Sequence, residues 1–129
     1  MAEVATPPAS GRVLIVDDDS DVRASLAEAL TSVGHDVGVA DSATNALQTL
    51  VHGRVAVVLS DVRMPGDDGI TLLRRIREGW PGIDVVMMTA YDDMQTVATA
   101  MREGAVDFLV KPVELAQLRT VLDRVIADR

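Results

Sequence analysis

Short apolar runs alternate with amphipathic segments along the whole chain. The runs are rich in Val, Leu, Ile and Met and predict strands over residues 12–16, 35–40, 55–60, 83–88 and 106–110. Each run is followed by a segment whose apolar residues recur at helical spacing, and Gly34, Gly79 and Gly104 end the first, third and fourth of these segments. We expect the recurring residues to form the inner faces of five helices: Val22, Leu26, Leu30 and Val33; Ala46, Leu47 and Leu50; Ile70, Leu73 and Ile76; Met94, Val97 and Met101; and Leu115, Leu118, Leu122 and Val125.

This alternation predicts an α/β fold with a parallel sheet. The runs at 12–16, 55–60 and 83–88 are almost continuously apolar, which is typical of strands that are covered on both faces. Short connections and right-handed crossovers then favour a doubly wound sheet of five strands and five helices. In such sheets, ligands bind beyond the carboxyl ends of the strands, where the strand order reverses.

Composition narrows the class of protein. The length of 129 residues suits one domain, and a hydrophobic content of 48% is enough to build a core. The net charge of −8 argues against direct nucleic-acid binding, which requires clustered Lys and Arg. The absence of Cys excludes thiol chemistry and fits a reducing cytoplasm. The longest unbroken apolar run, Val55–Leu59, is too short for a membrane span. We expect residues 1–10 to form a disordered leader and residues 11–129 to form the domain.

Polar residues follow the carboxyl ends of four of the five predicted strands. Asp17 and Asp18 follow the first strand, Asp61 the third, Thr89 the fourth and Lys111 the fifth. Helix capping explains a single such Asp, but it does not explain the coincidence at four strands. We therefore expect these side chains to share one shallow pocket. Capping remains the expected role of three other acidic residues near helix starts, which are Asp19, Asp67 and Asp68.

The expected pocket has the chemistry of a phosphate site. Three neighbouring carboxylates repel one another, and a hard divalent cation such as Mg²⁺ relieves that repulsion while leaving room for phosphate oxygens. A carboxylate can attack phosphorus to form an aspartyl phosphate. Lys111 would neutralise one phosphate oxygen, and the Thr89 hydroxyl would donate a hydrogen bond to another. The residues alone thus predict an Mg²⁺-assisted phosphate or phosphoryl site on a flavodoxin-like sheet.

Four segments at these positions together resemble the receiver domains of two-component response regulators. They are VLIVDDD at 13–19, DVRMPGDDG at 61–69, MTAY at 88–91 and GAVDFLVKP at 104–112. The resemblance covers about residues 11–128, and it implies the flavodoxin-like strand order 2-1-3-4-5. Each segment is moderately specific, whereas their combination, in this order and at strand ends, is highly specific.

The resemblance implies a role for each acidic residue of the pocket. Asp61 corresponds to the phosphoacceptor. Asp17 and Asp18 correspond to the acidic pair that binds Mg²⁺, with Asp18 a more direct ligand and Asp17 acting partly through water. Asp61 and the backbone carbonyl of Arg63 would complete the protein ligands, and Mn²⁺ can substitute for Mg²⁺.

The resemblance also implies a conformational switch. Thr89 corresponds to the switch hydroxyl, and the Ala90 amide and Lys111 would bind the phosphoryl group. Pro112 would follow a cis peptide bond. Phe108 corresponds to the switch aromatic residue. Lacking a hydroxyl, it can report only by moving into or out of its pocket.

The implied function is signal transduction by a phosphoprotein. A sensor histidine kinase would phosphorylate Asp61, and the response would control an output, with transcription the expected one. Homodimers formed on phosphorylation are common in this family. No output domain is recognised within the 129 residues. The domain would be a phosphoacceptor that dephosphorylates itself slowly rather than a turnover enzyme, because Arg63 and Tyr91 are bulky at the two positions that tune the lifetime in this family.

Two other functions fit part of the pattern. A phosphohydrolase of the haloacid dehalogenase type also uses an Asp after its first strand, so that residues 17–19 can be read as its Asp-x-Asp motif. The chain is short for such an enzyme and lacks a cap insertion and a late acidic pair. A degenerate receiver used only for binding is the other alternative, although all the key residues are present. The Asp→Asn change that abolishes covalent phosphate, at Asp61 or at Asp17, distinguishes receiver from hydrolase.

Overall fold

The computed structural model describes residues 11–64, 69–90 and 93–129. Five parallel strands form one sheet in the order β2-β1-β3-β4-β5. This confirms the predicted doubly wound, flavodoxin-like α/β fold. The elements are β1 (Arg12–Val16), α1 (Ser20–Ser32), β2 (Val37–Ala40), α2 (Ala43–His52), β3 (Val55–Asp61), α3 (Gly69–Gly79), β4 (Asp84–Thr89), α4 (Met94–Arg102), β5 (Asp107–Val110) and α5 (Leu115–Ala127).

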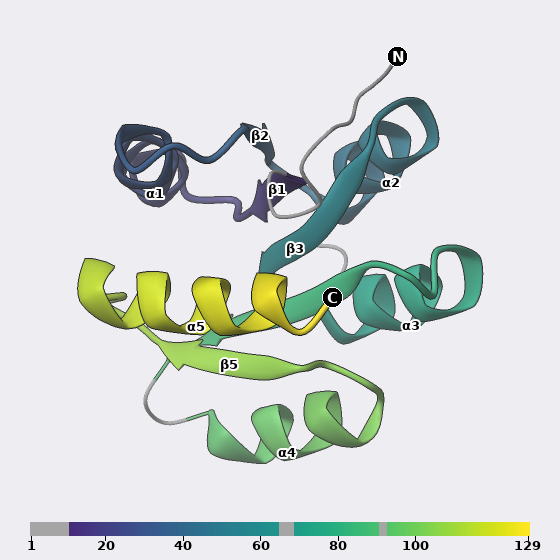
Figure 1. The fold of residues 1–129 in the computed structure, drawn as a ribbon. Coiled ribbons are helices and arrows are strands. Elements are labelled where there is room, and N and C mark those ends of the chain that lie inside the picture. Colours follow the sequence, from purple (N-terminus) through teal and green to yellow (C-terminus); the bar gives the residue numbers. More distant parts are fainter. Residues whose placement is uncertain (1–10, 65–68, 91–92) are drawn as a thin grey trace.

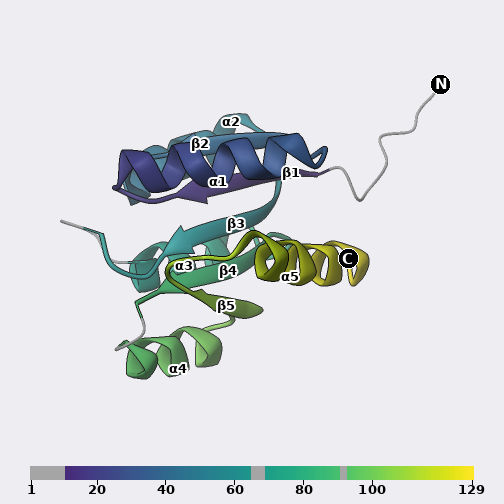
Figure 2. The ribbon, with the colours of Figure 1, turned by 90° about the vertical axis from the view of Figure 1, so that its left-hand side faces the viewer.

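Helices cover both faces of the sheet (Figure 1). Helices α1 and α5 pack on one face of the sheet, which is the face nearer the viewer in Figure 2. Helices α2, α3 and α4 pack on the other face. Side chains alternate between the two faces, so that in β1 Leu14 and Val16 join the core with α2 and α3, while Val13 and Ile15 join the core with α1 and α5. Both sets are buried, which explains why the strand sequences are continuously apolar.

Two of the three residues predicted to form the buried face of the fourth helix are exposed, so that prediction was wrong for them. Met94 and Met101 are 47% and 41% exposed, and the buried residues of α4 are Val97 and Ala100. This helix is short, contacts β4 and lies on the β4–β5 side of the sheet (Figure 1), so only a narrow stripe meets the sheet. Ala100 is small enough for a close approach, and the two Met side chains lie beside the stripe. Val33 and Leu115 are likewise more exposed than their spacing predicts, at 36% and 42%.

Other differences are small. Strands β2 and β5 begin at Val37 and Asp107, two residues and one residue later than predicted, and β3 and β4 extend to Asp61 and Thr89. The expectations for the leader, Asp67, Asp68 and Tyr91 fall outside the described residues. Within the described parts of the chain, no helix is long and apolar enough to cross a membrane.

Asp19 caps α1, as predicted. Its carboxylate accepts hydrogen bonds from the backbone N–H groups of Asp21 at 2.9 Å and Val22 at 3.3 Å. We expect Asp19→Ala to lower the free energy of unfolding by about 1 kcal/mol, the usual cost of losing such a cap. Phosphorylation should persist, because the cap lies outside the acidic cluster. Urea unfolding and phosphorylation assays of the same variant check both expectations, and loss of phosphorylation in a folded variant would contradict the assignment to capping alone.

Candidate phosphoryl and metal site

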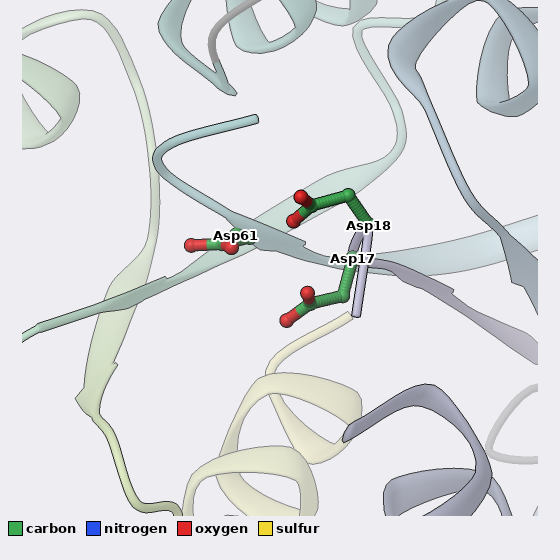
Figure 3. A group of neighbouring side chains, drawn as sticks. All are labelled: Asp17, Asp18 and Asp61. Atoms are coloured by element: carbon green, nitrogen blue, oxygen red, sulfur yellow. The ribbon is translucent and has the colours of Figure 1, made fainter. Parts of the chain in front are cut away.

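The carboxyl ends of β1 and β3 bring three carboxylates together (Figure 3). Asp17 and Asp18 directly follow β1, Asp61 ends β3, and the two strands are neighbours in the sheet, with Val16 paired to Ser60. One carboxylate oxygen from each residue lies within 4.8 Å of the others. The sequence prediction that these three residues share a pocket is therefore matched by the geometry.

Lys111 reaches this cluster from the far edge of the sheet. Its Nζ lies 2.7 Å from Oδ2 of Asp17 and 3.1 Å from Oδ2 of Asp61. The backbone N–H of Lys111 donates to the carbonyl of Thr89 at 2.8 Å, and the bond between Lys111 and Pro112 is cis, as expected. Lys111 is the only lysine in a chain with eleven arginines. A single ammonium group thus bridges two of the three carboxylates.

Burial and charge oppose each other at Asp61. Its side chain is 12% exposed, and this desolvation raises its pKa above the ordinary value of 3.8. The hydrogen bond and positive charge of Lys111 act to lower the pKa, and the negative charge of Asp17 adds to the rise. Burial acts to lower the pKa of Lys111, but its two carboxylate partners together raise it. Burial and the negative charge of Asp17 therefore place the ionised Asp61 carboxylate under electrostatic strain.

This strain predicts a pH-dependent effect of Asp61→Asn. A carboxyl group with a raised pKa in the folded state favours folding at low pH and opposes it as the pH rises through that pKa. Without Mg²⁺, the variant should be more stable than the wild type at pH 7, and this gain should vanish below the ordinary carboxyl pKa. Thermal unfolding at pH 7 and pH 3 measures it. A variant less stable than the wild type at pH 7 would contradict the assignment of strain to Asp61.

The donor set fits a hard divalent cation. Asp17 is fully buried, and its two carboxylate oxygens are engaged, since Oδ1 accepts the N–H of Asp19 at 2.9 Å and Oδ2 meets Lys111. Arg23 donates to the backbone carbonyl of Asp17 at 2.7 Å and so fixes this loop. Asp18, in contrast, is exposed and adjoins the Asp61 carboxylate. Oxygen ligands with one exposed carboxylate suit Mg²⁺, which retains several waters. The arrangement is consistent with Asp18 as a direct ligand and Asp17 as an indirect one.

The residues expected to form the switch lie at the end of β4 and within β5. Thr89 is buried at the end of β4, and its hydroxyl donates to the carbonyl of Ala90 at 3.2 Å. The N–H of Arg63 donates to Oδ1 of Asp61 at 3.3 Å. Phe108 is half-buried within β5 and packs against the core shared with α2 and α3. The roles of Thr89, Phe108, Ala90 and the Arg63 carbonyl remain predictions.

Two residues near the site have roles that the sequence analysis did not assign. A Cβ added to Gly69, at the start of α3, would lie 2.3 Å from the carbonyl oxygen of Asp61. Asp93 is a buried carboxylate that pairs with Arg63 beside the site. Its position immediately before a predicted helix was a usable signal, whereas the close approach of Gly69 exists only in three dimensions.

Comparison with known proteins identifies the protein family of this chain. Residues 13–123 match the model of the response regulator receiver domain. The chain is 43% identical over 115 residues to the response regulator protein FleR of Pseudomonas aeruginosa, covering 89% of this chain and 24% of FleR. It is 38% identical over 117 residues to the DNA-binding transcriptional regulator NtrC of Klebsiella pneumoniae, covering 91% of this chain and 25% of NtrC.

Solved structures agree with this assignment. A receiver domain protein from Clostridium thermocellum superposes with a TM-score of 0.87 at 29% identity, over 92% of this chain and 95% of that one. NtrX from Brucella abortus gives a TM-score of 0.89 at 31% identity, over 92% of this chain and 27% of NtrX. The chain belongs to the receiver domain family of two-component response regulators. It spans about a quarter of the length of FleR and NtrC.

Proposed function

We propose that the domain accepts a phosphoryl group on Asp61 in an Mg²⁺-dependent transfer from a sensor histidine kinase. The observation that carries this proposal is the contact of Lys111 with both Asp17 and Asp61 beside the exposed carboxylate of Asp18. One cation is already in place for a phosphate oxygen, and the acidic residues provide ligands for a second cation. Structural helix caps would not need this arrangement.

The chemistry at Asp61 is a displacement at phosphorus. A carboxylate oxygen of Asp61 attacks, the new P–O bond forms as the P–N bond to the donor imidazole breaks, and the bonding electrons leave with the imidazole nitrogen. Lys111 stabilises charge on a phosphoryl oxygen, and a buried Asp61 is poorly hydrated and so ready to attack. Bound Mg²⁺ would supply further charge neutralisation and orient the phosphoryl oxygens. Thr89 would then turn its hydroxyl from the Ala90 carbonyl toward the new group.

A groove beside the site suits the phosphoryl donor. It has a volume of about 500 Å³ and runs between α1 and the residues after β5, with Val22, Leu26, Pro112 and Val113 as apolar lining. Lys111 forms one end of it and also contacts Asp61. A kinase helix seated there would present a phosphohistidine to the acceptor. We therefore assign this groove to the sensor kinase.

The output is proposed from the relatives. FleR and NtrC are, by their names, a response regulator and a DNA-binding transcriptional regulator, so we propose that this receiver controls transcription through an attached or associated output unit. The exposed Met94 and Met101 of α4 and the neighbouring β5–α5 face would carry the signal, with homodimer formation on phosphorylation as one way of transmitting it. The domain would act in the cytoplasm as a phosphoacceptor and not as a turnover enzyme.

Intact mass spectrometry after incubation with acetyl phosphate tests the proposal. We expect one phosphoryl group on the wild type with Mg²⁺, and none without Mg²⁺ or with Asp61→Asn. A phosphohydrolase of the dehalogenase type would instead lose its adduct with Asp17→Asn and keep it with Asp61→Asn. No adduct on the folded wild-type protein would favour a degenerate receiver used only for binding.

We also expect the phosphorylated state to be long-lived. The side chains of Arg63 and Tyr91, two residues after Asp61 and Thr89, are both bulky and should hinder the approach of water. Arg63→Ala should shorten the half-life several-fold. Loss of the mass adduct over time, after removal of acetyl phosphate in the presence of Mg²⁺, measures both rates. A wild-type half-life of seconds would contradict this expectation.

A further inference from the structure

Asp93 precedes α4 at the N-cap position, but its side chain does not cap the helix. Asp93 occupies the N-cap position of α4, yet its carboxylate accepts no hydrogen bond from the backbone N–H groups of the first turn. Asp19 and Ser42 occupy the same position in α1 and α2, and both side chains accept such bonds. Aspartate is among the most favourable N-cap residues. Another interaction therefore holds the Asp93 carboxylate away from the helix amides.

Arg63 provides that interaction. Nε of Arg63 lies 2.6 Å from Oδ2 of Asp93, and Nη2 lies 3.0 Å from Oδ1, which is a two-pronged ion pair. The hydroxyl of Thr96 also donates to Oδ1 at 2.6 Å. The side chain of Asp93 is 9% exposed and that of Arg63 is 76% exposed. The Asp93 carboxylate thus pairs with a cation whose own side chain is mostly exposed.

The ion pair joins the segment after β3 to the residue that precedes α4. Arg63 is two residues from Asp61, and its backbone N–H donates to Oδ1 of the acceptor carboxylate. The backbone N–H of Asp93 donates to the carbonyl of Ala90 at 3.1 Å, directly after the buried Thr89. The pair therefore links the segment that follows Asp61 to the start of α4 and, through Ala90, to the end of β4, where Thr89 lies.

We propose that Arg63 and Asp93 form a latch that opens when Asp61 is phosphorylated, an inference that rests on the proposed function. An aspartyl phosphate brings close to two negative charges and three strong acceptor oxygens next to Arg63, and guanidinium groups bind phosphate with the same two-pronged geometry. The Arg63 guanidinium turns from Asp93 to the phosphoryl group. The Asp93 carboxylate then turns to the first-turn amides of α4 and becomes its N-cap.

The two arrangements differ in the orientation of one side chain, because the carboxylate that pairs with Arg63 through both oxygens accepts no backbone N–H of the first turn of α4. Loss of Arg63 leaves the Asp93 carboxylate without its cation, and the carboxylate then turns to new donors or to water. Both outcomes move the start of α4. Movement there meets little resistance, since Val97 and Ala100 are the buried residues of this helix. The exposed Met94 and Met101 move with it, so the latch couples Asp61 to the apolar surface of α4.

Three substitutions distinguish the effect of losing the ion pair from the effect of losing the capping side chain. Arg63→Gln removes the cation and leaves the capping carboxylate. Asp93→Asn removes the ion pair but keeps a side chain that caps about as well as aspartate, whereas Asp93→Ala removes both functions. Arg74→Gln is the matched control, because Arg74 pairs with Glu103 at 3.1 Å and likewise fastens α4, at its opposite end and away from Asp61.

NMR of the whole 129-residue chain tests the proposal. Without phosphorylation, Arg63→Gln and Asp93→Asn should move the α4 amide resonances along the line toward their positions in the phosphorylated wild type. We expect the activated population to rise about fivefold in each, which corresponds to about 1 kcal/mol. Arg74→Gln should leave the resonances in place, and Asp93→Ala should lose hydrogen-exchange protection in the first turn of α4. Phosphorylation of the wild type should shift the Arg63 Nε–H signal.

Two results would overturn the latch alone. One is that Arg63→Gln and Asp93→Asn keep the α4 resonances of the resting wild type. The other is that the Arg63 Nε–H signal stays unchanged while intact mass shows a full phosphoryl adduct. A missing adduct would instead overturn the proposed function, and the opening step with it. Intact mass and NMR on the same sample therefore tell the two failures apart.

Discussion

Replacing Lys111 with methionine should slow phosphorylation of Asp61 by about 100-fold or more, the usual effect of removing one preorganised charge from a site of this kind. Its Nζ lies 2.7 Å from Asp17 and 3.1 Å from Asp61, so the variant lacks both the partner of a fully buried carboxylate and the cation that meets the incoming phosphate oxygen. The initial rate of adduct formation with acetyl phosphate and Mg²⁺ measures the loss.

The same substitution should cost about 2 kcal/mol of unfolding free energy at pH 7, because two neighbouring carboxylates lose their cation. In the wild type, the raised pKa of Lys111 keeps this stabilisation up to the ordinary lysine value of 10.5, and it is lost only as the pH rises through the folded-state pKa. In Lys111→Met, the deficit should shrink as the pH falls, because burial raises the pKa of Asp61 and a protonated Asp61 needs no cation. Added Mg²⁺ should also reduce it.

Arg129→Gln is a matched control for Lys111→Met. Arg129 pairs with Asp84 at 2.8 Å, and its side chain is 27% exposed, against 26% for Lys111. The pair lies at the amino-terminal edge of the sheet, where Arg129 also donates to the carbonyl of Ala56. This variant should lose some stability and phosphorylate at the wild-type rate. Equal loss of phosphorylation in both variants would show that the effect of Lys111 is general destabilisation.

Gly69→Ala should disrupt the acceptor strand. The added Cβ would lie 2.3 Å from the carbonyl oxygen of Asp61 and 2.9 Å from Cα of Val62, and backbone atoms in a packed sheet cannot yield as a side chain can. The N–H of Gly69 also donates to the carbonyl of Val62 at 2.7 Å, so relief requires α3 to move from β3. We expect a loss of about 3 kcal/mol or more, at the upper end for overpacking. Urea unfolding measures it.

Gly79→Ala tests whether that loss comes from the close approach. Gly79 ends the same helix, and a Cβ added there meets no atom within 4 Å. Its replacement should change the unfolding free energy by less than about 0.5 kcal/mol. Similar losses in the two variants would attribute the effect to α3 in general rather than to contact with Asp61.

The fold and the acidic cluster could be predicted because both depend on local patterns. Continuous apolar runs identify buried parallel strands, and parallel strands place their carboxyl ends at one edge. Asp17, Asp61 and Lys111 meet there because each directly follows or ends a strand. The general rule that ligand-binding residues gather at this edge was sufficient to predict that residues distant in the sequence, such as Asp17 and Lys111, lie close together.

Other features depend on how elements pack, which the spacing of residues does not encode. The helical period alone placed Met94 and Met101 inside, but the position of α4 near the sheet edge leaves them exposed. The pairing of Arg63 with Asp93 requires two loops to approach each other, and no pattern in either loop specifies the partner. Gly69 is restricted by a backbone atom of a neighbouring strand. These are long-range contacts.

The chemical identity of residue 61 after phosphorylation tests the central claim most directly. Borohydride reduces an aspartyl phosphate to homoserine, whereas a free carboxylate does not react. After treatment with acetyl phosphate and Mg²⁺, reduction and peptide mass mapping, we predict homoserine at position 61 and unchanged aspartate at positions 17 and 18. Homoserine at position 17, or at none of the three in a protein shown to be folded, would contradict the assignment of Asp61 as the phosphoacceptor.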